Sequence, residues 1–291
     1  MEKNYGVVLG QRVTDWDNRR VGSDEIPYEV VNPSGNWELH LPVGEKQRNK
    51  IDDKMDCVTR SFTNSIEVQY KFKTGVERNF SDRFTATMSG TTKKGNYLWK
   101  VADSGMLDGL IDEHLYPTNT SMGWDEYYSP VPIELINKAL EFKNDWQINY
   151  QFIDFNRESL IYHLKQAPIQ VVVPGHAVLD FFTTKDVVKY FDSYEPFKKN
   201  YTGILCSACK IVLTKKNNDM YTLIRHPEKT GEVYALKGNV VRHIANFQTL
   251  QLGDKEPDRF WIWNKAEISI ATASDWSKYI EADEIHLDPK D

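Results

Sequence analysis

The segment from Asp52 to Glu67 constrains the fold most, because it predicts a buried helix that begins at a cysteine. One apolar residue recurs every four positions, at Val58, Phe62 and Ile66. This spacing places a single apolar stripe along a helix. Asp56 is positioned to cap the first turn, and Asp53 would take that role if the helix began earlier.

Cys57 falls in the first turn of this predicted helix. Unpaired backbone N–H groups and the positive end of the helix dipole favour an anion there, so we expect a thiol with a lowered pKa. The carboxylate of Asp56 acts in the opposite direction. A buried structural cysteine is the alternative, because free cysteines are among the most buried residues. The rest of the chain has to decide between these two interpretations.

Helical patterns come first along the chain, and strand patterns follow. Helical spacing or capping signals cover residues 81–89, 97–104, 133–143 and 156–165. Ser81 and Gly90 mark the ends of one of these helices, and Gly105 is expected to end the next. Alternating or β-branched runs cover residues 169–173, 176–182 and 187–194. A helical half followed by a β half predicts an α+β fold with a cleft where the halves meet.

The composition excludes several classes of protein. The net charge of -6 and the pI near 5.7 give no electrostatic reason to expect a nucleic-acid or membrane partner. No apolar run is long enough to span a membrane, and the first residues lack an apolar secretion signal. Three cysteines are too few for a disulfide framework. We therefore expect cytoplasmic synthesis and a fold without disulfides.

Several short motifs, in order along the chain, resemble those of the papain-like cysteine peptidases. They are Cys57 at a helix start, Gly95-Asn96-Tyr97-Leu98-Trp99, Gly105, Tyr116-Pro117, Gly175-His176-Ala177-Val178 and Asp192-Ser193-Tyr194. No single motif is specific, but the ordered set with suitable gaps is much stronger. The resemblance spans roughly residues 45–213. It implies a two-lobed papain-like fold, with a helical lobe, a β lobe and a cleft between them.

The resemblance also implies a role for each catalytic residue. Cys57 would be the nucleophile, His176 the base that takes its proton, and Asp192 the group that orients His176. The side-chain amide of Gln47 and the backbone N–H of Cys57 would form the oxyanion hole.

Substrate binding is implied at a separate stretch of the chain. Gly95 and Asn96 would pair with the substrate backbone as an added strand. The resemblance implies no metal and no organic cofactor. It implies a polypeptide substrate that is cleaved through an acyl-thioester.

The sequence departs from the family pattern at several positions. Met55-Asp56-Cys57-Val58 stands where the family has Cys-Gly-Ser-Cys-Trp. Ile51 occupies the position six residues before the nucleophile where a glutamine is usual, whereas Gln47 lies ten residues before it. Asp192 replaces an asparagine and Asn96 a glycine. An inhibitory propeptide of the usual size does not fit before Cys57. These departures indicate a divergent member that resembles forms encoded by bacteriophages or bacteria.

Two other functions remain open. A cell-wall peptide amidase would use the same triad. A non-catalytic virion structural or binding protein would retain only the papain-like scaffold, and the missing glutamine at the usual spacing favours it.

The two ends of the chain are predicted to lie outside the peptidase domain, which we expect at residues 51–213. Residues 1–50 read as an extended arm, and residues 214–291 as a small docking module. This module resembles hairpin-and-helix modules of bacterial and phage surface proteins, with a helix expected from Phe247 to Leu252. Its expected partner is a virion or cell-surface assembly. Cys206 and Cys209 are at best half of a zinc site, so we expect packing cysteines.

Overall fold

The computed structural model describes residues 6–8, 26–119 and 121–216 with their side chains, and the backbone of five further strands between residues 222 and 285. The chain divides into two compact units, Met1–Lys216 and Asn217–Asp291. Within the described residues, every helix is too short or too polar to cross a membrane.

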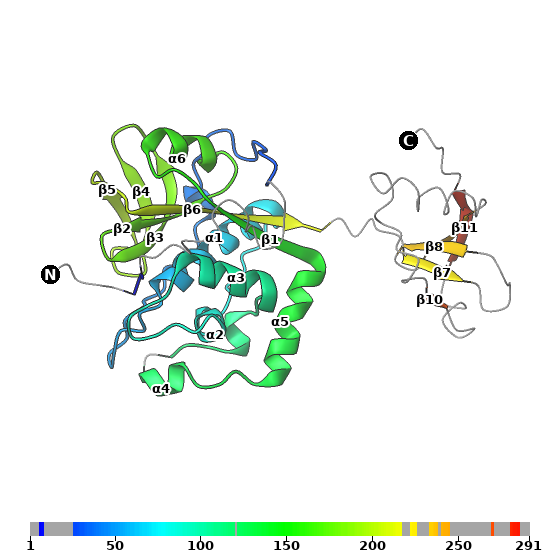
Figure 1. Ribbon diagram of the computed structural model, residues 1–291, viewed down its shortest axis with the longest axis horizontal. Coiled ribbons are helices and arrows are strands. Elements are labelled where there is room, and N and C mark those ends of the chain that lie inside the picture. Colours follow the sequence, from blue (N-terminus) through cyan, green and yellow to red (C-terminus); the bar gives the residue numbers. More distant parts are fainter. Residues whose placement is uncertain are drawn as a thin grey trace, which may run out of the picture. The chain divides into compact units, whose positions relative to one another are not determined.

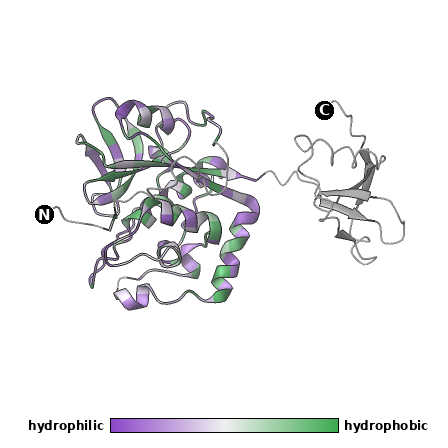
Figure 2. Ribbon diagram, viewed as in Figure 1, coloured by the Kyte–Doolittle hydropathy of each residue, from purple (hydrophilic) through white to green (hydrophobic). Residues whose placement is uncertain are grey.

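Helices dominate the chain up to residue 145. They are α1 (Cys57–Thr74), α2 (Asp82–Met88), α3 (Leu98–Asp108), α4 (Trp124–Tyr127) and α5 (Ile133–Asp145), with α6 (Arg157–Leu164) following later and single 3₁₀ turns at Glu38–His40 and Glu113–Leu115. Figure 1 shows α2 to α5 on one side of the first unit and the strands on the other. Hydrophilic and hydrophobic residues alternate along α5 in Figure 2, as expected for a helix that buries one side.

Six antiparallel strands form the sheet of the first unit, in the order β1-β6-β2-β3-β4-β5. Their bounds are β1 (Trp146–Phe152), β2 (Ile169–Val173), β3 (His176–Thr183), β4 (Val188–Phe191), β5 (Lys198–Tyr201) and β6 (Ser207–Lys215). This arrangement confirms the α+β fold, with a helical part and a sheet part, that the resemblance to papain-like peptidases implied.

The sheet separates two apolar clusters, and its two-residue periodicity explains why. On β2 and β3, the paired residues Val172 and Ala177 join the cluster that contains Phe62 of α1. Their neighbours Val171 and Val178 point the other way and join the cluster around Trp37, Leu160 and Leu164. Successive side chains of a strand face opposite sides, so both faces of this sheet are buried and both need apolar residues.

Helix α1 lies between the helical part and the sheet and touches both. Its predicted apolar stripe is confirmed, because Val58, Phe62 and Ile66 are fully buried. Two glutamines fix it to the sheet. Gln170 on β2 donates to the carbonyl of Val58 at 2.7 Å, and Gln69 both donates to and accepts from the backbone of β6 at 2.9 Å. Pairing buried polar groups in this way holds the start of α1 against β2.

Two local predictions about helix ends need correction. Asp56 occupies the N-cap position, but its carboxylate makes no capping hydrogen bond; it binds Arg60 and Tyr127 instead. Gly105 does not end α3, which continues to Asp108 and has Gly109 as its C-cap. The ring of Phe62 packs so closely on Gly105 that a Cβ there would overlap it. The Ser81 cap of α2 is confirmed by its hydrogen bond from Phe84 N–H.

The second unit is described only by the backbone of one sheet, in the order β10-β7-β8-β9-β11. Its strands are β7 (Thr222–Arg225), β8 (Val233–Lys237), β9 (Val240–Ile244), β10 (Ser269–Ile270) and β11 (Ile280–Ile285). The helix expected at residues 247–252 lies outside the described residues. The docking role of this unit stays a prediction.

Candidate active site

The nucleophile predicted from the sequence lies where helix and sheet meet. Cys57 is the first residue of α1 and is fully buried. Its Sγ accepts a hydrogen bond from the backbone N–H of Ala177 at 3.5 Å. Ala177 follows His176 on β3, so the fold brings the thiol to the strand that carries the predicted base.

His176 and Asp192 form a buried pair. The His176 Nε2 atom lies 2.7 Å from Oδ1 of Asp192, which is in the loop after β4. The other carboxylate oxygen accepts a hydrogen bond from Lys199 Nζ at 2.6 Å. Burial alone would raise the pKa of Asp192, but the hydrogen bonds and charges of His176 and Lys199 lower it below its ordinary value. The carboxylate therefore stays ionised and fixes the orientation of the imidazole.

The expectation of a lowered thiol pKa is wrong for this conformation. Burial raises the pKa of Cys57 above its ordinary value, and the carboxylates of Asp56, Asp53 and Asp192 add to the increase. The hydrogen bond from Ala177 N–H acts in the opposite direction but is outweighed. A helix N-terminus favours an anion only where water or a cation also reaches it, and here the thiol is enclosed.

Gln47 is buried beside the loop that carries Asp192. Its Nε2 donates to Asp53 Oδ1 at 2.6 Å, and its Oε1 accepts from Ser193 Oγ at 3.1 Å. Its backbone N–H also donates to the carbonyl of Ser193 at 3.1 Å. Gln47 thus joins the loop before α1 to the loop after β4, although ten residues separate it from Cys57. The two hydrogen bonds set which way its amide faces.

Asn96 pairs through its backbone with the segment Gly6–Val8, whereas the backbone of Gly95 pairs with Thr92. Val8 N–H donates to the carbonyl of Asn96 at 2.9 Å, and Asn96 N–H donates to the carbonyl of Gly6 at 3.0 Å. The side chain of Asn96 points the other way, where it donates to Ser89 and Thr91. The backbone of Asn96 thus forms an isolated parallel bridge with Val7, and its role in binding substrate stays a prediction.

Several residues of the site were not singled out from the sequence. Tyr194 donates its hydroxyl to Asp53 Oδ2, and Met55 N–H donates to Asp53 Oδ1 at 3.1 Å. Met55 also has a positive φ of 54°. Lys199 reaches Asp192 across seven residues. These contacts depend on loop conformation and carry no periodic sequence signal.

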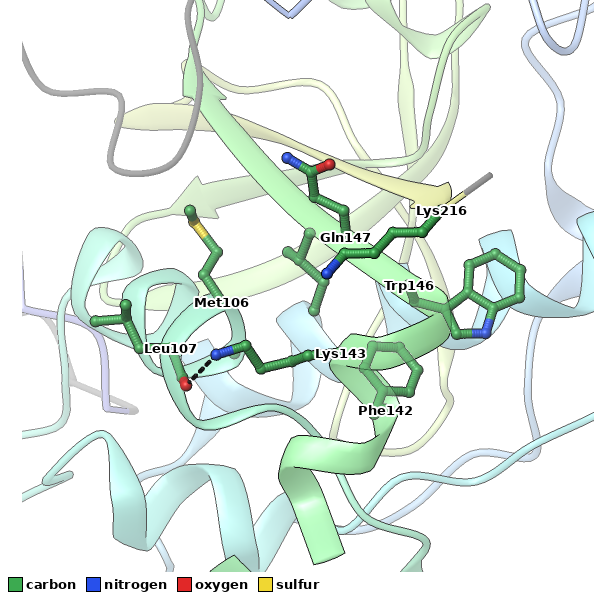
Figure 3. Close-up of a pocket in the computed structure, with 9 residues that line it drawn as sticks. Met106, Leu107, Phe142, Lys143, Trp146, Gln147 and Lys216 are labelled. Carbon is green, nitrogen blue, oxygen red and sulfur yellow. Dashed lines mark hydrogen bonds between the residues drawn. The ribbon is translucent and has the colours of Figure 1, made fainter. Parts of the chain in front are cut away.

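Among the described residues, pockets lie at three places in the first unit. One of about 1120 Å³ borders the loop of Gln47 and includes Lys46, Arg48, Tyr194 and Glu195 in its lining. A second, of about 310 Å³, lies between the ends of α3 and α5 and the start of β1 (Figure 3). There Lys143 donates to the carbonyl of Leu107 at 2.7 Å. A third, of about 560 Å³, includes Pro196 and Lys199 in its lining. The first and the third of these pockets border the segments around Asp192. Among the residues that the structure describes, no group of acidic, histidine and cysteine side chains could hold a metal ion.

No family model matches the sequence, and no curated protein matches it. Solved structures similar to the chain include procathepsin L 3 of the Tenebrio molitor larval midgut, with 14% identity, a TM-score of 0.48 and coverage of 61% of this chain and 68% of that one. A cysteine protease of Carica candamarcensis has 13% identity, a TM-score of 0.45 and coverage of 61% and 96%. The bromelain protease of Ananas comosus has 16% identity, a TM-score of 0.44 and coverage of 61% and 97%. At these values the similarity carries no information about the activity of this chain.

Proposed function

We propose that the chain is a cysteine peptidase in which Cys57, His176 and Asp192 act as the triad. The observation that carries the proposal is the 2.7 Å contact between His176 and Asp192, next to a thiol that touches the residue following His176. These contacts support the proposal, because Cys57 borders the strand of His176 and His176 is bonded to Asp192, and all three residues are buried. Such a constellation is recognised by its geometry and roles.

The reaction follows from which ring nitrogen is engaged. Asp192 binds Nε2 of His176, so Nδ1 is the nitrogen that exchanges a proton with the thiol. The thiolate of Cys57 attacks the carbonyl carbon of a peptide bond, and His176 then protonates the departing amine. Water adds to the thioester in the second step, and the carboxylic acid product leaves with the thiol restored.

The oxyanion of the tetrahedral intermediate would be held by the N–H of Cys57 and the amide of Gln47. Asp53 and Ser193 orient this amide, and an oriented donor costs little reorganisation during the reaction. Removal of one such donor typically lowers the rate by about 10²–10³. The negative charge of Asp53 near the site opposes the oxyanion, and its hydrogen bonds from Tyr194 and Met55 reduce that effect.

The substrate would be a polypeptide in extended conformation. Gly95 and Asn96 would bind its backbone as an added strand. The large pocket beside Gln47 offers room for side chains of the substrate, and both acidic and basic residues line it.

A non-catalytic role, such as a structural or binding protein of a virion, is the second candidate. The observation that favours it is the complete burial of Cys57 together with the raised pKa of its thiol. A thiol in that state is a poor nucleophile. Catalysis requires that the site open to substrate.

The test compares wild-type protein with Cys57→Ala on casein, on purified peptidoglycan and on a mixed peptide library. Cys206→Ala is the matched control, because Cys206 is also a cysteine of the first unit that forms no disulfide. We expect cleavage by the wild type and by Cys206→Ala, and none by Cys57→Ala at an unchanged melting temperature. Cleavage of peptidoglycan alone would favour the amidase. Equal activity of all three proteins, or none in any, would contradict the peptidase.

A further inference from the structure

The segment Gly6–Val8 lies in the region assigned to substrate. Its backbone hydrogen bonds to Asn96 give a parallel bridge between Val7 and Asn96. Val7 is 5% exposed and belongs to the same apolar cluster as Cys57. The three residues Gly6, Val7 and Val8 thus bind to Asn96 as an extended peptide would.

Gly6 lies in a narrow gap between the backbones of Met55 and Gly95, which we call the passage. The passage leaves no room for a side chain on Gly6. A Cβ built on Gly6 would overlap the backbone of Met55, and a Cβ built on Gly95 would overlap the backbone of Gly6. Backbone atoms form both walls, so neither can give way by rotating a side chain. Gly6 also has a φ of 114°, which side-chain-bearing residues rarely adopt.

The passage lies close to the nucleophile. Met55 precedes Cys57 by two residues, and two peptide units span at most about 7.6 Å between Cα atoms. The positive φ of Met55 shapes the turn immediately before α1. A peptide that passes between Met55 and Gly95 therefore runs beside the first turn that carries the thiol.

We propose that the passage between Met55 and Gly95 is a glycine-selective subsite, and that Gly6 is its internal occupant. The specificity inference rests on the proposed function, since it names the class of peptide that the site would accept. Peptides with glycine at the clamped position followed by a β-branched residue fit it, as Gly6-Val7 does. Any larger residue at that position must push one backbone wall away.

The internal occupant also competes with substrate for Asn96. While Val8 N–H and Gly6 carbonyl are bonded to Asn96, a substrate strand cannot use the same two groups. Release of Gly6–Val8 thus uncovers both the passage and the binding strand.

The first experiment measures alkylation of Cys57 by iodoacetamide with mass mapping, which requires no hydrolysis. Two variants, Gly6→Ala and Val8→Pro, should weaken the binding of Gly6–Val8 in the passage. Gly6→Ala adds a Cβ that overlaps the backbone of Met55. Val8→Pro removes the N–H that donates to the carbonyl of Asn96. Gly123→Ala is the matched control, because a Cβ there meets nothing within 4 Å. We expect both variants to be alkylated at Cys57 at least about tenfold faster than wild type, with Gly123→Ala unchanged. Unchanged rates in Gly6→Ala and Val8→Pro would overturn the internal occupant.

The second experiment tests selectivity in Gly6→Ala protein. The peptide Asn-Tyr-Gly-Val-Val-Leu repeats residues 4–9, and Asn-Tyr-Ala-Val-Val-Leu differs only at the clamped position. We expect the glycine peptide to protect Cys57 from alkylation at a concentration at least about tenfold lower than the alanine peptide requires. Equal protection by both peptides, or by neither, would overturn the glycine subsite. Protection without any peptide cleavage would retain the subsite and reject only the peptidase.

Discussion

Two buried polar groups share the first turn of α1, and they are built differently. The first group centres on Arg60, which binds Asp56 at 3.1 Å and Asp82 at 2.8 Å. The other group centres on Cys57, which receives one long hydrogen bond from a backbone N–H. Burial lowers the pKa of Arg60, but Asp56 and Asp82, with a smaller contribution from Glu45 at 3.4 Å, raise it above its ordinary value. Carboxylates therefore compensate its charge.

Burial thus serves stability in the Arg60 group and chemistry in the Cys57 group, within one turn of the same helix. A guanidinium enclosed by carboxylates has its charge compensated in the resting protein. The thiol, beside a histidine whose orientation is fixed by Asp192, is neutral at rest and can become charged when a proton moves. Loss of the first group should therefore damage folding, and loss of the second should damage the reaction.

The largest effect is expected for the reacting group. His176→Ala should lower kcat by about 10⁴-fold or more, because no base then takes the thiol proton. The melting temperature should change little, and the exposed His114→Ala is the control that retains activity. Hydrolysis assays and thermal unfolding measure the two effects. A large loss of stability in His176→Ala would remove the contrast with Arg60.

Arg60→Met should give the largest loss of stability. It leaves the buried Asp56 and Asp82 without their cation, which costs about 3–5 kcal/mol in comparable buried pairs. Lys71→Met, on the same helix, removes a partly exposed ion pair with Glu77 and should cost at most about 1 kcal/mol. Urea unfolding measures both. Similar losses in the two variants would show that the Arg60 group is not a structural centre.

Asp180 is a buried carboxylate outside both groups. It accepts hydrogen bonds from Thr183 Oγ1 at 2.6 Å and from Phe182 N–H at 3.0 Å. Burial raises its pKa to about 7. The folded state then binds more protons than the unfolded state between pH about 4 and 7, so this residue lowers stability as the pH rises through that window. Asp180→Asn should be more stable than wild type at pH 8 by on the order of 1–3 kcal/mol, and the difference should vanish near pH 4. Urea unfolding at both pH values measures it; a difference that is independent of pH would contradict the raised pKa.

The smallest effect concerns the support of Asp192. Lys199→Met removes a cation 2.6 Å from the carboxylate, so the pKa of Asp192 should rise toward its ordinary value. The acid limb of the activity profile should therefore shift to higher pH. Lys198→Met is the control, because Lys198 binds the exposed Glu38 instead. An unshifted acid limb in Lys199→Met would mean that His176 alone keeps Asp192 ionised.

Local patterns in the sequence predicted the parts of the site that lie on regular elements. The four-residue spacing of Val58, Phe62 and Ile66 predicted α1 and put Cys57 at its start. The apolar run after Gly175 predicted the strand of His176. The helix is marked by apolar residues at regular spacing and the strand by a short apolar run, so in both cases a short stretch of sequence contains the information.

The parts that could not be predicted depend on contacts between distant loops. The pairing of Gly6 with Asn96 joins residues 90 positions apart. The enclosure of Cys57 involves β3 and three carboxylates from two loops, so a local helix-dipole argument gave the wrong direction for its pKa. Gln47 could be proposed from the sequence because it is a glutamine upstream of Cys57. Its hydrogen bonds to Asp53 and Ser193 depend on how the loops fold and could not be predicted.

The most direct test of the central claim is the pH dependence of Cys57 alkylation in wild type and His176→Ala, mapped by mass. Iodoacetamide reports thiolate formation without the need for a substrate. If Cys57 and His176 form a working pair, Cys57 should react selectively, and its rate should fall at least about tenfold in His176→Ala while Cys206 and Cys209 keep theirs. Equal, slow alkylation of all three cysteines, unchanged in His176→Ala across the pH range, would contradict the catalytic pair.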